Sequence, residues 1–339
     1  MPKLIIQIPC LNEEETLPIT LGDLPRSVPG FDVVEWLIID DGSTDRTVEI
    51  ARAHGVDHIV SLPHNHGLAR AFMAGLEAAL KLGADVIVNT DADNQYDASC
   101  IPDLVRPIVE RKAQIVIGAR PITEIEHFSP IKKFLQLFGS WVVKVASDTV
   151  IADAPSGFRA IHRDAAIRLN VFSPYTYTLE TIIQAGRKDI PIMSVPIRVN
   201  GYLRPSRLVK SISSYVWRSI VTVIRIFIVY CPMRFFALCS AVTAAPGLLM
   251  IGRFFYHYMI GIGEGNVQSL VLSGALLALS GIFLMSGFLA ELISVNRILL
   301  EEIRVRQLQK ELDPRDSGVV FRNVNKDVAI TPNQMKTAG

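Results

Sequence analysis

The chain has 339 residues, 50% of them hydrophobic and 20% charged, which excludes a disordered or collagen-like protein and is enough for about two domains. The 34 basic and 33 acidic residues give a net charge of +1, so the overall charge does not indicate a nucleic-acid partner. The four scattered cysteines exclude a disulfide-rich scaffold and show no metal-ligand spacing.

The first 120 residues alternate strand patterns with helical patterns. Short runs rich in Val and Ile predict strands at 3–8, 33–40, 58–62, 85–90 and 114–118. Apolar residues at helical spacing predict helices at 15–24, 44–55, 67–83 and 100–112. This alternation indicates βαβ units and a mostly parallel sheet covered on both faces. The first apolar run is too short for a signal peptide, so we expect this part in the cytoplasm.

Ligands of such sheets bind at the carboxyl ends of the strands, where this chain places polar residues. After the first strand, Asn12 suits a helix N-cap, and the acidic residues Glu14 and Glu15 suit the first turn of the helix. These roles require no ligand.

Two adjacent carboxylates, Asp40 and Asp41, end the second strand. Ser43 or Thr44 can cap the next helix, and Gly42 allows the turn between them. Capping requires only one short polar residue. The second carboxylate, Asp41, therefore predicts a ligand contact, such as a ribose or a base.

Two more aspartates, Asp91 and Asp93, follow the fourth strand. Because they lie two positions apart at a turn, their carboxylates can converge on one cation. Hard carboxylate oxygens suit Mg²⁺ or Mn²⁺, which usually keep waters and bridge substrate phosphates. A single Asp-x-Asp is a weak signal, but its position at the end of a buried strand strengthens it.

Several motifs together resemble family 2 glycosyltransferases of the GT-A fold. The resemblance covers about residues 3–210 and is closest to the polyprenyl-phosphate glycosyltransferase branch, which includes dolichyl-phosphate mannose synthase and undecaprenyl-phosphate glucosyltransferases. It implies a Rossmann-like domain that binds a nucleotide sugar, and Mg²⁺ or Mn²⁺ as the cofactor. The motifs are Pro9 to Glu13, Asp40-Asp41-Gly42-Ser43 with Asp45, Asn65 and Gly67 with Ala71, Asp91-Ala92-Asp93 with Gln95, Gly118-Ala119-Arg120 and Ser156-Gly157-Phe158-Arg159.

The resemblance also implies roles for individual residues. Asp91, Asp93 and Gln95 would hold the divalent ion on the donor diphosphate, and Asp93 would be essential for catalysis. The nucleotide would also be bound by Pro9, Leu11, Glu13, Asp41 and Ala92.

Phosphate groups would meet basic residues. The resemblance implies that Arg120 reaches a phosphate and that Arg198, Arg204 and Arg207 are candidates for the diphosphate or the lipid phosphate. An ordinary surface position is the alternative for Arg120.

Asp153 would lie on the acceptor side as a base or a positioning group. A phosphate monoester has a second pKa near 6, so it is mostly ionised at pH 7 and needs little deprotonation. A helix cap or an ion pair with Arg159 is the alternative for Asp153. Glu180 is a further candidate carboxylate, on a helix that we expect to be buried.

Two long segments account for the excess of apolar residues. Residues 235–252 and 265–290 carry no charged side chain. Since about 20 helical residues cross a hydrocarbon core of about 30 Å, they predict two transmembrane helices, at about 234–258 and 266–292. A buried helical hairpin in a soluble core is the alternative. Lys and Arg flank the pair and are absent from its loop, so we expect both termini and the catalytic domain in the cytoplasm.

The sequence therefore divides into a catalytic GT-A domain at 1–207, a juxtamembrane helix at 208–231, the hairpin at 232–295 and a cytoplasmic helix with a flexible tail at 296–339. Residues 208–231 and 131–147 both mix Trp and basic residues into an apolar helical pattern, which predicts helices lying in the membrane interface. Ordinary surface helices are the alternative.

Together these features predict a metal-dependent hexosyltransferase of the inner cell membrane. Because the sequence shows no evident enzyme nucleophile, we expect a single displacement that inverts the configuration. The donor would be a nucleotide-diphosphate sugar, with UDP-glucose as the first candidate and GDP-mannose as the alternative. The acceptor would be a polyprenyl phosphate such as undecaprenyl phosphate, and family resemblance suggests a homo-oligomer.

Other classes fit the sequence less well. A catalytically silent nucleotide-binding membrane scaffold would tolerate a broken Asp-x-Asp motif, which is intact here. A processive polysaccharide synthase would share the fold but requires a Q-x-x-R-W type motif and more spans, and a transporter also requires more spans.

Overall fold

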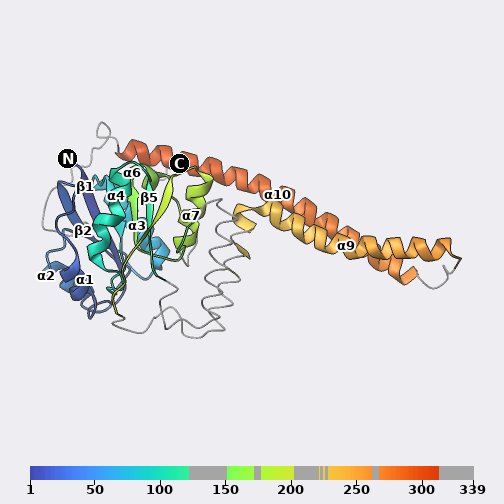
Figure 1. Ribbon diagram of the computed structural model, residues 1–339, viewed down its shortest axis with the longest axis horizontal. Coiled ribbons are helices and arrows are strands. Elements are labelled where there is room, and N and C mark those ends of the chain that lie inside the picture. The colour runs from blue at the N-terminus through green and yellow to red at the C-terminus, as the bar shows by residue number, and fades with distance from the viewer. Residues whose placement is uncertain are drawn as a thin grey trace, which may run out of the picture. The chain divides into compact units, whose positions relative to one another are not determined.

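The computed structural model describes residues 1–121, 151–171, 177–201, 221, 224–225, 228–261 and 267–312 (Figure 1). Contacts divide the chain into two units, Met1–Tyr215 with Arg304–Gly339 and Val216–Ile303. The predicted interfacial segment 131–147 lies outside the described residues, and so does most of 208–231. Both interfacial helices therefore stay predictions.

The first unit is built around one seven-stranded sheet, ordered β3-β2-β1-β4-β6-β5-β7. Every pairing in it is parallel except those of β6 with β4 and with β5. This confirms the predicted mostly parallel sheet. The strands are β1 (Lys3–Cys10), β2 (Val33–Asp40), β3 (His58–Ser61), β4 (Val86–Asn89), β5 (Ile115–Ala119), β6 (Arg159–His162) and β7 (Ile192–Pro196).

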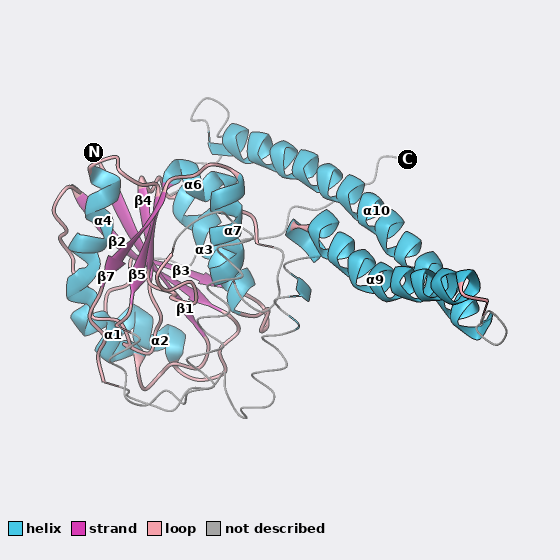
Figure 2. Ribbon diagram, turned by 45° about the vertical axis from the view of Figure 1, so that its right-hand side comes forward, coloured by secondary structure: helices cyan, strands magenta, loops and turns pink. Residues whose placement is uncertain are grey.

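Helices cover both faces of this sheet, as predicted (Figure 2). The five strands and four helices predicted in the first 120 residues are confirmed within a few residues of their bounds. The helices of this unit are α1 (Leu17–Asp23), α2 (Thr47–Ala53), α3 (Leu68–Lys81), the short 3₁₀ helix η1 (Ala98–Cys100), α4 (Ile101–Val109), α6 (Arg163–Arg168) and α7 (Thr178–Arg187).

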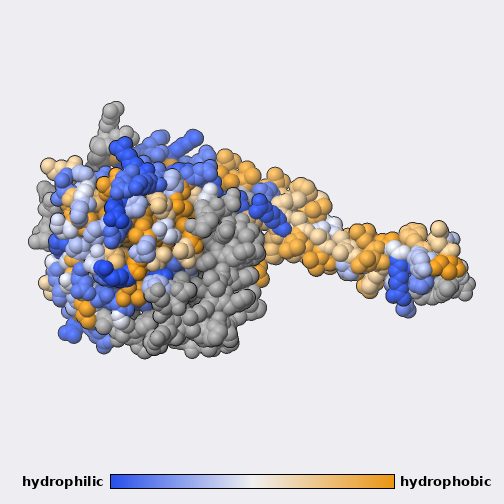
Figure 3. All heavy atoms as spheres, viewed as in Figure 1, coloured by the Kyte–Doolittle hydropathy of each residue, from blue (hydrophilic) through white to orange (hydrophobic). Residues whose placement is uncertain are grey.

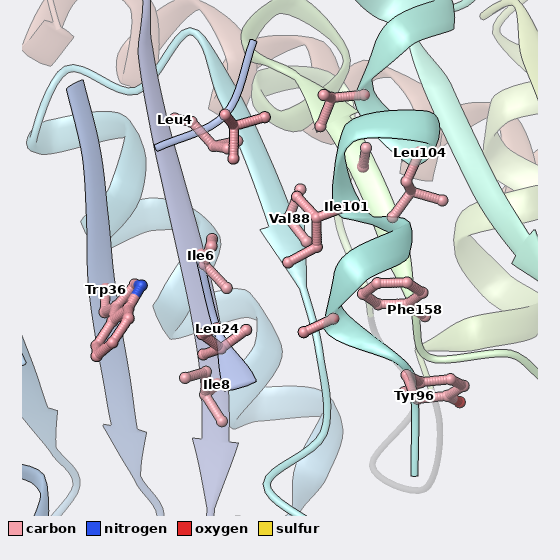
Figure 4. Packing of buried hydrophobic residues seen from close by; sticks show 14 of the residues in the cluster. Leu4, Ile6, Ile8, Leu24, Trp36, Val88, Tyr96, Ile101, Leu104 and Phe158 are labelled. Carbon is pink, nitrogen blue, oxygen red and sulfur yellow. The ribbon is translucent and has the colours of Figure 1, made fainter. Parts of the chain in front are cut away.

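The core follows from the alternation of side chains along β1. Leu4, Ile6 and Ile8 point to one face, where they pack with Ile101 and Leu104 of α4 (Figure 4). Residues at the intervening positions point to the opposite face, which α3 covers. There α3 approaches the sheet closely at Gly75, whose added Cβ would lie 2.6 Å from Oε1 of Gln7.

The predicted helix caps are wrong. Asn12 has a positive φ of 55° and lies well before α1, which follows Thr16. Its side-chain oxygen accepts from the backbone N–H of Thr44 at 2.8 Å. Glu14 also lies outside α1 and accepts from the backbone N–H of Arg46 at 3.2 Å. The polar residues after β1 and β2 therefore tie these two loops to each other.

The residues before α2 also differ from the predicted helix caps. Ser43 accepts from the backbone N–H of Asn12 at 3.0 Å, so it does not cap the helix. Asp45 instead accepts from the backbone N–H of Thr47 at 3.0 Å. The turn at Gly42 is confirmed by its φ of +78°, and an added Cβ would lie 2.7 Å from the backbone of His64.

The second unit contains the hairpin helices α9 (Pro232–Met259) and the first part of α10 (Val267–Leu312). Both are long and apolar enough to cross a membrane, with mean hydropathies of 1.9 and 2.1 in their most apolar windows. Only 6% and 11% of those windows are buried, unlike the core helix of a soluble protein, and their apolar surface is visible in Figure 3. α10 continues without a break past the predicted end of the second span.

Candidate active site

Strand pairing brings two distant sequence motifs together at the carboxyl edge of the sheet. β6 runs antiparallel to β4, with Asn89 opposite Arg159. The turn that precedes β6 therefore meets the residues that follow β4. Gly157 of this turn is so near the first aspartate of the Asp-x-Asp motif that an added Cβ would lie 3.1 Å from Oδ2 of Asp91.

The two aspartates of this motif repel each other in the free protein. Burial, and after it the charge of Asp93, raises the pKa of the Asp91 carboxyl to about 7, and the charge of Arg120 opposes this rise. Burial also raises the pKa of the Cys10 thiol, with contributions from the carboxylates of Glu13, Asp40, Asp45 and Asp91. This edge of the sheet is therefore a region of concentrated negative charge.

Such a pair fits a divalent cation. A bound cation would offset the repulsion from Asp93, which after burial is the second cause of the raised pKa of Asp91. In the part of the chain that the structure describes, no three His, Cys, Asp or Glu side chains form a group that could hold a metal. Waters and oxygens of a bound diphosphate would complete the coordination. Gln95 is partly buried beside the pair, and its backbone N–H donates to Asp93 at 3.2 Å.

Arg120 and Asp153 form a two-pronged ion pair. Nε of Arg120 lies 2.7 Å from Oδ2 of Asp153, and Nη2 lies 3.1 Å from Oδ1. Asp153 is fully buried, whereas 14% of the Arg120 side chain is exposed. The alternative of an ordinary surface position for Arg120 is therefore wrong. Asp153 forms an ion pair with Arg120, whereas the alternative from the sequence was an ion pair with Arg159.

Arg159 is also fully buried and has different partners. Its guanidinium donates to the carbonyls of Ser156 and Ala154, both at 2.8 Å, and to the hydroxyl of Thr181. Burial lowers the pKa of Arg159 to about 10, although nearby tyrosines and aspartates oppose this effect. These bonds hold the turn at 154–158 in place.

The candidate nucleotide-binding residues lie around the ends of β1, β2 and β4. Asp41 is buried, and its two oxygens accept from the backbone N–H groups of His66 and Gly67, both at 2.8 Å. The second carboxylate of this pair therefore has a structural use that its sequence position did not reveal. Pro9 and Ala92 are buried, while Leu11 and Glu13 are partly exposed.

Of the three other candidate phosphate-binding residues, the structure describes Arg198. Arg198 is bound to the side chains of Asp97 at 2.7 Å and Ser99 at 2.6 Å, and 72% of its side chain is exposed. It reaches this edge because Val199 pairs with Tyr96, directly after the Asp-x-Asp turn. Arg204 and Arg207 lie outside the described residues, so their roles stay predictions. Glu180 is buried on α7, as predicted.

Sequence reasoning missed a group of buried polar side chains behind the two aspartates. Asn89 is fully buried at the end of β4 and binds Gln7, Tyr177 and the carbonyl of Gly157. Tyr96 accepts from the backbone N–H of Gly157 at 3.0 Å. One signal was available, because Gln7 and Asn89 are polar residues inside otherwise apolar strands.

Comparisons with known proteins agree with this architecture. The family model described as Glycosyl transferase family 2 matches residues 5–169. An undecaprenyl-phosphate mannosyltransferase of Micrococcus luteus is 31% identical over 200 residues, which cover 56% of this chain and 80% of the relative. A UDP-N-acetylglucosamine–dolichyl-phosphate N-acetylglucosaminyltransferase of Methanococcus voltae is 27% identical over 215 residues, covering 56% of this chain and 83% of the relative.

Among solved structures, glucosyl-3-phosphoglycerate synthase from Mycobacterium tuberculosis, in complex with Mn²⁺, UDP and phosphoglyceric acid, superposes with a TM-score of 0.51. The match covers 66% of this chain and 78% of that chain at 20% sequence identity. At this identity the likeness concerns the fold alone.

Proposed function

Because this chain belongs to glycosyl transferase family 2, we propose that it transfers a hexose from a nucleotide-diphosphate sugar to a polyprenyl phosphate at the cytoplasmic face of a membrane. The observation that carries this proposal is the meeting of Asp91 and Asp93 with the Arg120–Asp153 pair at one edge of the sheet. Carboxylates suit a cation, and an adjacent arginine suits a phosphate.

Two findings support a lipid phosphate as the acceptor. The Micrococcus and Methanococcus relatives carry names that specify undecaprenyl phosphate and dolichyl phosphate. The chain also carries two apolar helices with little burial, which would keep the enzyme on the membrane that holds such a lipid. We infer that α9 and the first part of α10 span the membrane as a hairpin.

Asp91 and Asp93 would hold Mg²⁺ or Mn²⁺ on the donor diphosphate, with Gln95 beside them. When bound, the ion supplies positive charge that stabilises the departing diphosphate. Asp91, Ala92 and Asp93, together with Pro9, Leu11, Glu13 and Asp41, would line the nucleotide site. Asp41 contributes by fixing the loop at 64–67 through its two backbone hydrogen bonds.

Arg120 would meet a phosphate, and Asp153 would hold its guanidinium in place through both oxygens. An acceptor phosphate is already largely ionised at pH 7, because its second pKa is near 6. Its oxygen would attack the anomeric carbon directly while the bond to the diphosphate breaks, which inverts the configuration. Asp153 then acts by positioning Arg120, since the attacking oxygen has little proton to lose.

UDP-glucose is the donor that we propose first, and the Methanococcus relative also carries UDP in its name. GDP-mannose is the second candidate, because the Micrococcus relative is named as a mannosyltransferase.

The test offers the purified full chain a panel of UDP- and GDP-sugars with undecaprenyl phosphate and Mg²⁺ or Mn²⁺, and analyses the lipid fraction by mass spectrometry. We expect one glycolipid whose mass equals that of the acceptor plus one hexose residue, which is a hexose less one water. Nucleotide binding without any glycolipid, across the whole panel, would instead favour a silent membrane scaffold.

A further inference from the structure

The turn around Gly157 is fixed on both sides of its backbone. The N–H of Gly157 donates to the hydroxyl of Tyr96 at 3.0 Å. Its carbonyl accepts from Nδ2 of Asn89 at 2.9 Å and from the hydroxyl of Tyr177 at 3.4 Å. Three side chains from different parts of the chain therefore converge on one residue, and we call them the Gly157 clamp.

The clamp is rigid because its members are buried and held by other groups. Asn89 is fully buried, and its oxygen accepts from Nε2 of Gln7 at 2.9 Å. Tyr177 is 1% exposed, and its ring stacks on Phe72 with centroids 3.9 Å apart. Its hydroxyl also accepts from Asn89 at 3.0 Å. A buried hydrogen-bond network of this kind specifies one arrangement.

The Gly157 clamp holds the Gly157 backbone close to the first aspartate of the Asp-x-Asp motif. A Cβ at position 157 would lie 3.1 and 3.2 Å from the two oxygens of Asp91 and 2.9 Å from the hydroxyl of Tyr177. Asn89 also belongs to the strand that leads into Asp91, two residues earlier. Asn89 therefore belongs to the backbone that leads to Asp91, and all three side chains hold the Gly157 backbone beside its carboxylate.

We propose that Tyr177, Asn89 and Tyr96 are positioning residues of the metal site, which fix the Asp91 carboxylate through Gly157 in the place from which it holds the divalent cation. This inference rests on the proposed function, because it assumes that Asp91 binds the metal. Groups behind a metal ligand orient it, and their loss typically costs about 10–100-fold in metal affinity or activity.

Tyr177→Phe tests this proposal, because it removes the hydroxyl and keeps the ring that stacks on Phe72. Transfer is measured across a Mn²⁺ titration at saturating donor and acceptor, and Mn²⁺ binding in the presence of UDP or GDP is measured separately by electron paramagnetic resonance. We expect the half-saturating Mn²⁺ concentration to rise about tenfold in both measurements. The rate at saturating Mn²⁺ should stay within about twofold of that of the wild type.

Tyr230→Phe is the matched control, since it removes the hydroxyl of another buried tyrosine, in the second unit. Its Mn²⁺ dependence should equal that of the wild type. Tyr96→Phe removes the acceptor of the Gly157 N–H from the other side and should also raise the half-saturating concentration, which keeps the test decisive if Tyr177→Phe does not fold.

The two ideas fail differently. Unchanged Mn²⁺ affinity in folded Tyr177→Phe or Tyr96→Phe, even with a slower rate, would overturn the clamp while the wild type still requires metal. A wild type that binds no Mn²⁺ and turns over fully in excess EDTA would overturn the metal site itself, and the clamp with it.

Discussion

At the residue scale, Asp93 is the simplest test of the metal site. It is partly exposed beside Asp91, and its charge adds to the rise in the pKa of that carboxyl. Asp93→Ala removes one of the two carboxylates among the proposed metal ligands and leaves the core untouched. We expect transfer to fall by at least about 100-fold, with an unchanged unfolding temperature.

The measurement is glycolipid formation by Asp93→Ala at saturating Mn²⁺, with a thermal melt to verify folding. Asp103→Ala is the control, since Asp103 is an exposed residue on α4 that pairs with Arg106 at 3.1 Å. Normal turnover in Asp93→Ala would contradict the proposed role.

Asp91 should destabilise the metal-free protein as the pH rises. Its pKa in the folded state is about 7, above the ordinary value, first because of burial and second because of Asp93. The folded protein therefore holds a proton that the unfolded chain has already lost, so stability falls between about pH 4 and pH 7. Asp91→Asn should remove this effect.

We therefore expect metal-free Asp91→Asn to be inactive yet more stable than the wild type at pH 8, by roughly 1–3 kcal/mol, since a tenfold change in proton affinity is worth about 1.4 kcal/mol. Urea unfolding in EDTA at pH 8 and at pH 4 measures the difference, which should shrink at the lower pH. If the wild type and Asp91→Asn have equal free energies of unfolding at both pH values, the pKa of Asp91 is not raised in the folded protein.

At the element scale, the hairpin helices pack at positions seven residues apart, and all of these residues except Met233 are small. Met233, Ser240 and Gly247 of α9 contact α10 near Gly287, Ser280 and Ser273 respectively. The hydroxyls of Ser240 and Ser280 lie 2.8 Å apart. Small residues let the two backbones approach closely, which stabilises helix pairs in lipid.

This packing predicts different effects for two glycines of α10. An added Cβ at Gly287 would lie 3.0 Å from that of Phe236, whereas Gly281 has nothing within 4 Å. Gly287→Leu should destabilise the hairpin by about 1–3 kcal/mol through overpacking, and Gly281→Leu should not. Thermal unfolding in detergent micelles compares the two variants, and equal melting temperatures would contradict this packing.

The elements themselves were largely predictable. Val and Ile runs gave β1 to β5 correctly because a strand buried on both faces is apolar throughout. β6 and β7 were not predicted as strands. Short runs such as Arg159–His162 carry polar ends, and their strand form depends on β4 and β5 lying on either side.

At the scale of the whole molecule, the GT-A fold and the glycosyltransferase family predicted from the sequence are confirmed by the family match and the solved structure. The membrane topology and the oligomeric state stay predictions. Basic residues flank the hairpin and its loop has none, so we expect the loop on the outer side.

A cysteine introduced as Glu264→Cys tests this topology. An impermeant maleimide added to intact cells should label it, while Glu49→Cys on the exposed surface of α2 should be labelled only after lysis. The native protein serves as the blank, because three of its four cysteines are buried. Labelling of Glu49→Cys in intact cells would reverse the orientation.

Local patterns in the sequence determined the strands and helices of the first 120 residues, the Asp-x-Asp motif at a strand end and the two apolar helices, because hydrophobic periodicity and length are properties of neighbouring residues. Only the tertiary structure decided which distant groups meet. The antiparallel entry of β6 beside β4 brings Gly157 to Asp91, and the end of β5 brings Arg120 to Asp153. Such contacts depend on strand order, and no local pattern in the chain encodes strand order.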